Sequence, residues 1–398
     1  MNRIDKNNPS QAWIDSIRTR YPCEQEIDRV LTRKLLRRAG PAYAPVSLER
    51  LVSGLKGLLK KELNDPFEIR EARWLTGGAS KLQVAIRLDW VKPGVGRTET
   101  PMVIRMEPAE SIVETSRLRE FELIRAVNGV LPVPPVYWID TEGEYFPYPA
   151  IVYGFAEGVA KPTGVISNVT GLGINYGTDL RPKLAEQYVD HLALLHTWDW
   201  RGAALDSFDK PVPGVQAVEW HLNWWERVWE EDVNRDVPLM RLTASWLREN
   251  MPATEHLSIQ HGDYRAGNFL FDERQGRITS WLDWELAHIG DYHEDVAYTL
   301  LPYLGHSSED GAVLLVSGMM SHEALCERYQ KSSGLTLNPK TLDYYLLFQA
   351  YKAAVIILAS SYRPARNAKT HQDLLLTWIM GLGYSILDFI RDKLEEIA

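Results

Sequence analysis

The chain has 398 residues, of which 45% are hydrophobic and 24% are charged. This is the usual mixture of a globular protein with a substantial core, and it excludes a wholly disordered chain, a collagen-like fibre and a small disulfide scaffold. The formal net charge of -9 disfavours a nucleic-acid-binding protein, because such proteins more often carry a basic face.

Two cysteines, Cys23 and Cys326, form neither a CxxC pair nor a zinc-ligand pattern, which indicates reduced thiols in a reducing compartment. The first residues contain no apolar segment of the kind found in secretory signals. The apolar run at 374–387 is too short to span a bilayer, so we predict a buried helix there. We therefore expect a soluble, cytoplasmic protein without a membrane or nucleic-acid partner. No pattern in the sequence indicates an oligomeric state.

Residues 1–66 are predicted to form a helical N-terminal extension. Leucines and isoleucines recur at three- and four-residue spacing over 24–39 and 47–63, which is the pattern of amphipathic helices. The Asp65-Pro66 pair then ends the helical pattern, because proline has no amide hydrogen for the helix ladder.

A different periodicity follows, with short strand-like runs separated by Gly-Gly and Lys-Pro-Gly turns. A longer run with helical spacing comes next, and the prolines of LPVPPV forbid its continuation. The order of three strands, a helix and a further strand predicts an α+β half over 67–155. The expected elements are strands 68–75, 82–90, 102–106 and 150–155, and a helix over 111–127.

Helical periodicity dominates from residue 156 to residue 398. Within this half lies one island of strands and loops, at 257–285, which carries nearly all of the polar signatures. A loop-rich island on a helical scaffold is a common place for a functional site. The expected helices cover 181–196, 217–231, 238–249, 321–332, 344–361 and 371–394.

The island contains the sequences HGDYRAGNFLFD and WLDWE. Between 261 and 295 there are eight acidic and three basic residues, an excess of negative charge that is costly unless a positive group joins it. Hard divalent cations with oxygen ligands are the obvious candidates. Four residues separate Asp263 from Asn268, and an apolar hairpin then leads to Asp283. This arrangement matches the Asp-x4-Asn catalytic loop and the following metal aspartate of phosphotransferases.

With these motifs the sequence resembles the aminoglycoside phosphotransferase-like family, the small-molecule kinases of the protein-kinase fold. HGDYRAGN is similar to the family's HGDxxxxN motif, WLDWE to (L/I)DWE, and IGDYHEDVAY to GDxxxDLA. The resemblance covers roughly residues 70–390. It implies a two-lobed, protein-kinase-like α+β fold. The N-lobe at 67–155 would bind the nucleotide, and the mainly helical C-lobe at 156–398 would hold the catalytic loop and the acceptor site.

The resemblance also implies a role for each matching residue of the island. Asp263 orients the substrate hydroxyl and accepts its proton, while Asn268 and Asp283 hold Mg²⁺ against the nucleotide phosphates. Arg265 either neutralises the transferring phosphoryl group or pairs with a neighbouring acid.

The remaining polar residues of the block are expected to serve the fold. His261, His288 and His293 match no zinc-ligand spacing, so we predict structural roles, with His261 as a tether of the catalytic loop. We expect Asp291 and Asp295 to act by capping or by bonding to that loop.

Upstream, LTGGAS resembles the loop that covers the phosphates between the first two strands. Gly77 and Gly78 let the backbone approach phosphate oxygens, and Ser80 can donate a hydrogen bond. The loop lacks the full G-x-G-x-x-G pattern of protein kinases. The segment VYGFAE, with Tyr153 and Phe155, corresponds to the hinge whose backbone reads the adenine edge.

Arg105 stands where kinases carry a strand lysine. Arginine is always charged and can contact a phosphate through two donors, so the contact remains feasible. We expect Glu120, in preference to Glu122, to be its ion-pair partner.

One predicted helix carries four tryptophans, in two pairs at i,i+4 spacing: Trp220 with Trp224, and Trp225 with Trp229. At 3.6 residues per turn the two pairs point about 140° apart. Either both pairs pack in the core, or one pair forms a wall of the acceptor site. Such a wall would suit an apolar or planar acceptor.

The sequence therefore predicts a Mg²⁺-assisted phosphotransferase that uses ATP or GTP and a small-molecule hydroxyl. We favour a hydroxyacyl-CoA-like or other hydroxylated metabolite over an aminoglycoside, although an aminoglycoside phosphotransferase is an alternative. A metallophosphoesterase would need further histidine and aspartate ligands, often in GNH, whereas Phe269 follows Asn268. An inactive nucleotide-binding module is the third alternative, and the intact Asp263, Asn268 and Asp283 argue against it.

Overall fold

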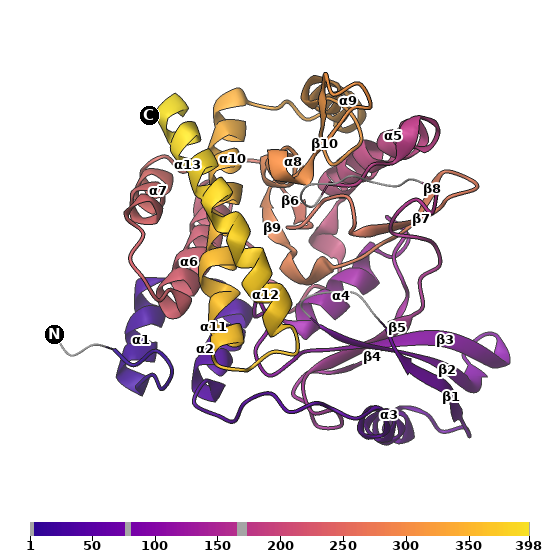
Figure 1. Cartoon of the computed structure of the whole chain (residues 1–398). Coiled ribbons are helices and arrows are strands. Elements are labelled where there is room, and N and C mark those ends of the chain that lie inside the picture. The colour runs from indigo at the N-terminus through magenta and orange to yellow at the C-terminus, as the bar shows by residue number, and fades with distance from the viewer. Residues whose placement is uncertain (1–3, 76–80, 165–172, 398) are drawn as a thin grey trace.

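An antiparallel sheet of five strands, in the order β1-β2-β3-β5-β4, forms the smaller, N-terminal lobe (Figure 1). The computed structural model describes residues 4–75, 81–164 and 173–397. The strands span Glu68–Trp74 (β1), Leu82–Lys92 (β2), Gly96–Met106 (β3), Val136–Asp140 (β4) and Ala150–Gly154 (β5).

The two faces of this sheet pack against different helices. On one face, residues such as Ile104 pack with the leucines of α3 (Leu48–Glu62). On the other face, Val103 belongs to a small cluster that also includes a phenylalanine of α4 (Arg117–Val127). Successive side chains of a strand alternate between faces, so Arg105 of β3 points to the same side as Val103. The alternation thus directs this arginine toward α4.

The larger lobe is mainly helical and is organised around one hydrophobic core (Figure 1). Short antiparallel strand pairs, β6 with β9 and β7 with β8, carry the predicted catalytic block. The strands are Leu257–Gln260 (β6), Phe269–Asp272 (β7), Arg277–Trp281 (β8), His288–Asp291 (β9), His306–Ser307 (β10) and Leu314–Leu315 (β11). The helices are Gly177–Thr197 (α5), Gln216–Asp232 (α6), Pro238–Glu249 (α7), His293–Thr299 (α8), His322–Ser333 (α9), Pro339–Val355 (α10), Tyr362–Arg366 (α11), Asp373–Ile379 (α12) and Gly383–Ile397 (α13).

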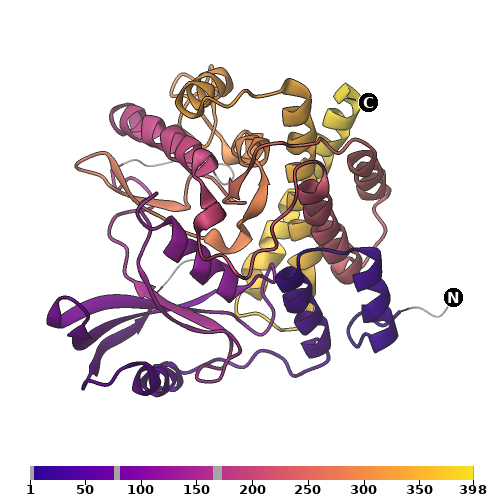
Figure 2. The same cartoon turned by 180° about the vertical axis from the view of Figure 1, so that it is seen from behind.

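The N-terminal extension is divided between the two lobes (Figure 2). Helices α1 (Gln11–Arg20) and α2 (Gln25–Arg37) lie against the helical lobe, whereas α3 lies along the sheet. A buried carboxylate at the end of α6, that of Asp232, anchors α2. It lies 3.1 Å from the Nζ atom of Lys34 and accepts a hydrogen bond from Arg38.

Several elements differ from the sequence-based expectation. The helix predicted over 111–127 begins only at Arg117, because the Ser116 hydroxyl accepts a hydrogen bond from the amide of Arg119 and caps the helix there. Helix α1 and strand β4 were not predicted. Strand β4 directly follows the prolines of LPVPPV and lies at the edge of the sheet, where a preceding proline costs no ladder hydrogen bond.

The prediction that residues 374–387 form a buried helix is wrong. Leu374, Trp378 and Tyr384 are 81%, 68% and 65% exposed, and α12 is separated from α13 by a short 3-10 turn. Hydrophobicity alone does not show how many faces of a helix have neighbours, and here the core contacts only part of the helix surface.

Two helical stretches of the described chain, Pro339–Arg366 and Asp373–Ile397, are long and apolar enough to cross a membrane by length and composition. The apolar window of the first is 78% buried inside the protein, as in a core helix, and that of the second is 22% buried. Length and composition by themselves are weak evidence for a membrane span, since core helices meet the same criterion.

We predict that Asp232→Asn lowers the free energy of unfolding by about 3–5 kcal/mol at neutral pH, because Lys34, Arg38 and Arg363 lose their buried carboxylate. Burial by itself raises the pKa of Asp232, but these cations lower it from 3.8 to about 2. The stabilisation is therefore complete above pH 3.8 and is lost as the pH falls toward 2. Urea unfolding at pH 7, 4 and 3 should show a difference from wild type that narrows in acid.

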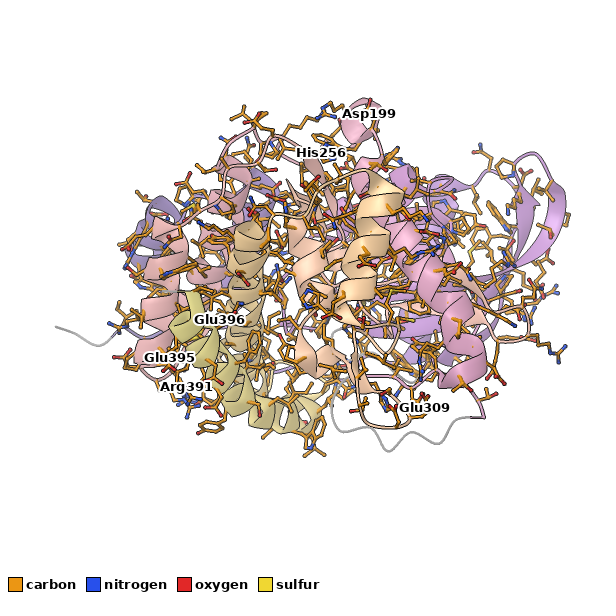
Figure 3. All side chains as sticks on the ribbon, turned by 90° about the horizontal axis from the view of Figure 1, so that it is seen from above. Asp199, His256, Glu309, Arg391, Glu395 and Glu396 are labelled. Atoms are coloured by element: carbon orange, nitrogen blue, oxygen red, sulfur yellow. The ribbon has the colours of Figure 1, made fainter. Side chains whose placement is uncertain are left out.

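The control for this experiment is Asp392→Asn. Asp392 pairs with Arg391 on α13, at the periphery of the molecule (Figure 3), and its side chain is 66% exposed. Exposed pairs of this kind contribute less than about 1 kcal/mol. Equal losses for the two variants would contradict the anchoring role of Asp232.

Candidate active site

The backbone of the predicted catalytic loop is fixed by one buried aspartate. The two carboxylate oxygens of Asp295 accept hydrogen bonds from the amides of His261 (2.6 Å) and Gly262 (2.9 Å). Gly262 has a φ angle of +79°, and a Cβ atom there would lie 2.4 Å from the carbonyl oxygen of Leu286. Only glycine therefore fits at the second position of HGD.

The histidine of this motif also has structural contacts. Its Nε2 atom lies 3.0 Å from the carbonyl oxygen of Leu282, and its ring lies 4.5 Å from that of Trp284. Burial lowers the pKa of His261. These contacts join the loop to the segment that follows β8, in line with the predicted tether.

Asp263 lies at the centre of a set of hydrogen-bond donors. Its Oδ2 atom accepts from the Nδ2 atom of Asn268 at 2.6 Å, and its Oδ1 atom accepts from the Nε atom of Arg265 at 3.0 Å and from the hydroxyl of Tyr298. Arg265 thus pairs with a neighbouring acid, which is one of its two predicted roles. Tyr298 was not predicted, although it is the last residue of the quoted IGDYHEDVAY segment, which was a usable signal.

Asn268 and Asp283 are brought together by the β7–β8 hairpin, and the amide of Leu282 donates to the carbonyl oxygen of Asn268 at 2.8 Å. Asp283 adopts a left-handed conformation, with φ 65° and ψ 50°. Among the described residues, none donates a hydrogen bond to Oδ1 of Asn268 or to Oδ2 of Asp283. An amide oxygen and a carboxylate oxygen are the donors that Mg²⁺ prefers, so these two residues fit a magnesium site.

Arg105 connects the sheet to this block. Its guanidinium lies 2.7 Å from Glu120 of α4 and also donates to Asp283. Burial opposes the charged form, but Asp283, Glu120 and Glu285 outweigh it and raise the pKa of Arg105 well above its usual range. The predicted Arg105–Glu120 pair is present. Glu122 instead accepts hydrogen bonds from Ser207.

Three charged residues of this network had no role in the sequence-based prediction. Glu285 lies 3.1 Å from Nζ of Lys81 and 2.9 Å from Nη2 of Arg117. Burial would raise the pKa of Glu285, but Lys81, Arg105 and Arg117 lower it strongly. The position of Glu285, two residues after Asp283 in the quoted WLDWE motif, was a usable signal. Lys81 and Arg117 had none, because only the fold brings them together.

Of the other described residues predicted to bind the nucleotide, only one lines the cavity that contains Asp263. Tyr153 of β5 lines the same cavity as Asp263 and Arg105. Phe155 does not line it, is 39% exposed, and donates its amide hydrogen to the carbonyl oxygen of Pro101 at 3.0 Å. The predicted phosphate-loop residues Gly77, Gly78 and Ser80 lie outside the described part of the chain.

A cavity of about 500 Å³ between the lobes is lined by Arg105, Tyr153, Asp263, Asn268 and Asp283. One wall is apolar, because the helix after α10 changes to a π-helical turn (Ile356–Ser360) that places Ile356 and Ile357 at the cavity. Ile379 of α12 continues this wall. Single π-helical turns are frequent at functional sites, and this one adds apolar surface beside the catalytic loop.

The tryptophans of α6 do not form part of this cavity. Trp224 and Trp225 are stacked, with centroids 5.3 Å apart, and both are buried in the core together with Trp229. Trp220 is half-buried. Of the two alternatives for this helix, packing in the core holds for Trp224, Trp225 and Trp229. Neither pair lines the cavity, whose apolar wall includes isoleucines instead. The i,i+4 spacing showed on which face of the helix each tryptophan lies, but it did not show which elements pack against that face.

One buried group of possible metal ligands in the described chain, formed by His221, His288 and Glu294, is a hydrogen-bonded cluster. The indole of Trp225 donates to Nε2 of His221 at 2.7 Å, which leaves the proton of neutral His221 on Nδ1, 3.0 Å from Glu294. A metal at Nδ1 would require the lone pair that this proton occupies. Burial lowers the pKa of His221 to about 3, which agrees with a neutral ring.

Comparison with known proteins identifies the family. Residues 76–317, more than half of the chain, match the model of APH, the phosphotransferase enzyme family.

The chain belongs to this family. Solved structures give the same fold. A Ralstonia eutropha protein described as an aminoglycoside phosphotransferase matches with a TM-score of 0.63 and 18% identity, over 87% of this chain and 98% of that one. A type I macrolide 2'-phosphotransferase matches with a TM-score of 0.53 and 17% identity, over 85% and 99%. The predicted two-lobed, protein-kinase-like fold is thereby confirmed.

The curated relatives are longer proteins that are named as acyl-CoA dehydrogenase family members. Acyl-CoA dehydrogenase family member 10 of Mus musculus is 23% identical over 315 residues, which is 76% of this chain and 27% of the relative. Acyl-CoA dehydrogenase family member 11 of Gallus gallus is 28% identical over 176 residues, which is 42% and 22%. The chain thus spans about a quarter of the length of these relatives.

We predict that Gly262→Ala lowers the free energy of unfolding by about 2–4 kcal/mol, because it combines an unfavourable φ angle with a clash against the backbone of Leu286. Gly94→Ala is the matched control: Gly94 has a φ angle of +73° but no atom within 4 Å of an added Cβ. Its cost should be about 1 kcal/mol, from the φ angle alone. Denaturant unfolding of both variants measures the difference, and equal costs would show that the loop accommodates the methyl group.

Proposed function

We propose that the protein transfers the γ-phosphoryl group of a nucleoside triphosphate, ATP or GTP, to a hydroxyl group of a small molecule. The observation that carries this proposal is the convergence of Asp263, Asn268, Asp283 and Arg105 on one cavity in a chain of the phosphotransferase family. Phosphoryl transfer depends mainly on positioning and on charge neutralisation, and this cavity offers both.

In this proposal Asp263 receives the acceptor. Its carboxylate would accept a hydrogen bond from the reacting hydroxyl, align that oxygen with the phosphorus atom and take its proton. The donors that surround Asp263 keep its carboxylate oriented, since both oxygens are hydrogen-bonded. Arg265, beside Asp263, would neutralise charge on the transferring group.

The nucleotide would bind on the side of Arg105. Asn268 and Asp283 would hold Mg²⁺ through the two oxygens that accept no hydrogen bond from the described residues. When bound, the cation supplies positive charge to the β- and γ-phosphates. The pair of Arg105 with Glu120 holds the guanidinium near the same place. A structure of similar fold is the GDP and kanamycin complex of APH(2″)-IIIa, with a TM-score of 0.53, which supports a nucleotide as the donor.

For the acceptor we propose an uncharged or anionic hydroxylated metabolite, such as a hydroxyacyl thioester. The carboxylates that line the described cavity are Glu120, Asp263, Asp283 and Glu285, and each lies beside an arginine or a lysine. None is left to bind the ammonium groups of an aminoglycoside. The isoleucine wall favours an apolar chain. The acyl-CoA dehydrogenase names of the relatives point to acyl thioesters as well.

The acceptor class is tested by steady-state kinetics with MgATP or MgGTP. We expect a kcat/KM of about 10⁴ M⁻¹s⁻¹ or more for at least one hydroxyacyl-CoA, and a much lower value for kanamycin-like amines. Asp263→Asn is the control for true phosphoryl transfer, and it should reduce turnover by about 10²–10⁴-fold while the protein stays folded. A kcat/KM above ~10⁴ M⁻¹s⁻¹ for the amines would overturn the choice of acceptor.

A second prediction concerns the metal. Asp283→Ala should abolish Mg²⁺-dependent nucleotide binding, because Mg²⁺ in such sites relies on one or two carboxylates and the phosphates. Calorimetry with the nucleotide, with and without Mg²⁺, measures this effect. Glu273→Ala, in the turn of the same hairpin, removes a half-buried carboxylate that accepts hydrogen bonds from Thr163 and does not line the cavity, so it should leave the affinity unchanged. Unchanged affinity in Asp283→Ala would contradict the assignment.

A further inference from the structure

The hydroxyl group of Tyr303, in the cavity between the lobes, has no role in the proposed phosphoryl transfer. The hydroxyl of Tyr303 is shielded from solvent and has no hydrogen-bond partner among the described residues, although Tyr303 lines the cavity. Leaving a phenol hydroxyl unpaired costs free energy, so folded proteins rarely contain one without a reason. A ligand in the cavity would supply the missing partner.

The position of this hydroxyl is fixed by the backbone. Tyr303 is the middle residue of a 3-10 turn, Pro302–Leu304, that follows α8. Leu301 and Leu304 on either side are buried in the core. The amide of Leu304 donates to the carbonyl oxygen of Leu301 at 3.0 Å, and proline limits the φ angle at the start of the turn. The side chain is therefore presented from a rigid support.

Tyr303 lines the same cavity as Asp263, the residue that would receive the acceptor. Burial raises the pKa of Tyr303, and the charge of Asp263 raises it further. The neighbouring Tyr298 differs, because its hydroxyl already donates to Asp263. A molecule in this cavity whose hydroxyl binds Asp263 can therefore reach Tyr303 with another of its atoms.

The charged groups near this part of the cavity indicate which kind of ligand atom would bind Tyr303. Arg265 lies beside Asp263, and the ammonium group of Lys352 donates to the carbonyl oxygen of Gly262 at 2.7 Å and lies 4.6 Å from the ring centroid of Tyr298. These cations already pair with Asp263 and with a carbonyl oxygen, so no carboxylate of the described cavity is left to bind an ammonium group of the ligand. The phenol hydroxyl can instead donate to a ligand oxygen with lone pairs. The isoleucine wall formed by 356, 357 and 379 then accommodates an apolar chain.

We propose that Tyr303 is a specificity residue of the acceptor site, and that it donates a hydrogen bond to a carbonyl or carboxylate oxygen of the acceptor. The acceptor would carry a hydroxyl for Asp263, this second oxygen for Tyr303 and an apolar chain along Ile356, Ile357 and Ile379. The inference rests on the proposed phosphotransferase function and narrows its substrate to hydroxy acids or their thioesters.

Tyr303→Phe tests this inference, because it removes only the hydroxyl. The probes are positional isomers of hydroxyhexanoyl-CoA, the corresponding free hydroxyhexanoic acids, and secondary hexanols, which carry the hydroxyl but no carbonyl. The variant should lose roughly tenfold in kcat/KM, mainly through KM, for whichever of the first two probe sets the wild type uses. That set identifies the oxygen as a thioester carbonyl or a carboxylate. Rates with hexanols and the affinity for nucleotide should not change.

Tyr344→Phe is the matched control. Tyr344 also has a buried hydroxyl without a partner among the described residues, but it lies in α10 and does not line the cavity. This variant should behave as the wild type with every probe.

The outcomes separate the inference from the function on which it rests. A Tyr303→Phe protein that keeps wild-type KM values for the carbonyl-containing acceptors overturns the inference. An equal loss with hexanols, or a loss of nucleotide affinity, also overturns it, because either result indicates a merely structural role. If the wild type phosphorylates none of the probes, the proposed hydroxyacyl acceptor itself is overturned, and the inference falls with it.

Discussion

The buried charge network between the lobes is the constraint on which the rest of the site depends. Three carboxylates, Glu120, Asp283 and Glu285, lie around one guanidinium, that of Arg105. Buried carboxylates this close would take up protons or move apart without the cations. Because Arg105 belongs to the sheet and Asp283 to the C-lobe, the same ion pair also connects the lobes. In the proposed function the phosphates and Mg²⁺ use these charges, so nucleotide binding and contact between the lobes are linked.

A second layer of polar residues fixes the loop that this network faces. Asp295 holds the backbone of the HGD motif, and Lys352 binds the carbonyl oxygen of Gly262 from α10. Behind them, His221 and Glu294 lie 3.0 Å apart in a buried pair, and the indole of Trp225 donates to the other ring nitrogen of His221. Such layers matter for phosphoryl transfer, because the reaction gains its rate from the positions of groups that are already in place.

The side of the cavity that we propose for the acceptor differs in chemistry from the side proposed for the nucleotide. Its wall is made of isoleucines from a π-helical turn and from α12, and its free polar group is a tyrosine hydroxyl. Carboxylates, by contrast, are committed to ion pairs. In the proposed function, a fold shared with aminoglycoside and macrolide phosphotransferases would thus accept another class of acceptor, since substrate choice depends on lining residues and not on the fold.

Through the resemblance of its motifs, the sequence by itself determined the family and the two-lobed fold, and it predicted that Asp263, Asn268 and Asp283 lie together. It could do so because Asp263, Asn268 and Asp283 are close in the chain, and their spacing on a loop and a hairpin is set by local backbone geometry. The pairing of Arg105 with Glu120 was also predictable, through the resemblance. The sequence did not indicate Lys81, Arg117 or Tyr303 as members of the site, because no local pattern relates them to it. Tyr298 ends the quoted IGDYHEDVAY segment, but that pattern gave it no role.

Only the tertiary structure decided which faces of the helices have neighbours. The tryptophans of α6 and the apolar residues of α12 have similar helical patterns, yet Trp225 is fully buried and Trp378 is 68% exposed. Periodicity records the direction of a side chain relative to its own helix, whereas burial depends on what packs against that direction from elsewhere in the chain. The acceptor wall is made in the same way, from segments that meet only in the folded protein, and so the identity of the acceptor is the property that the sequence left open.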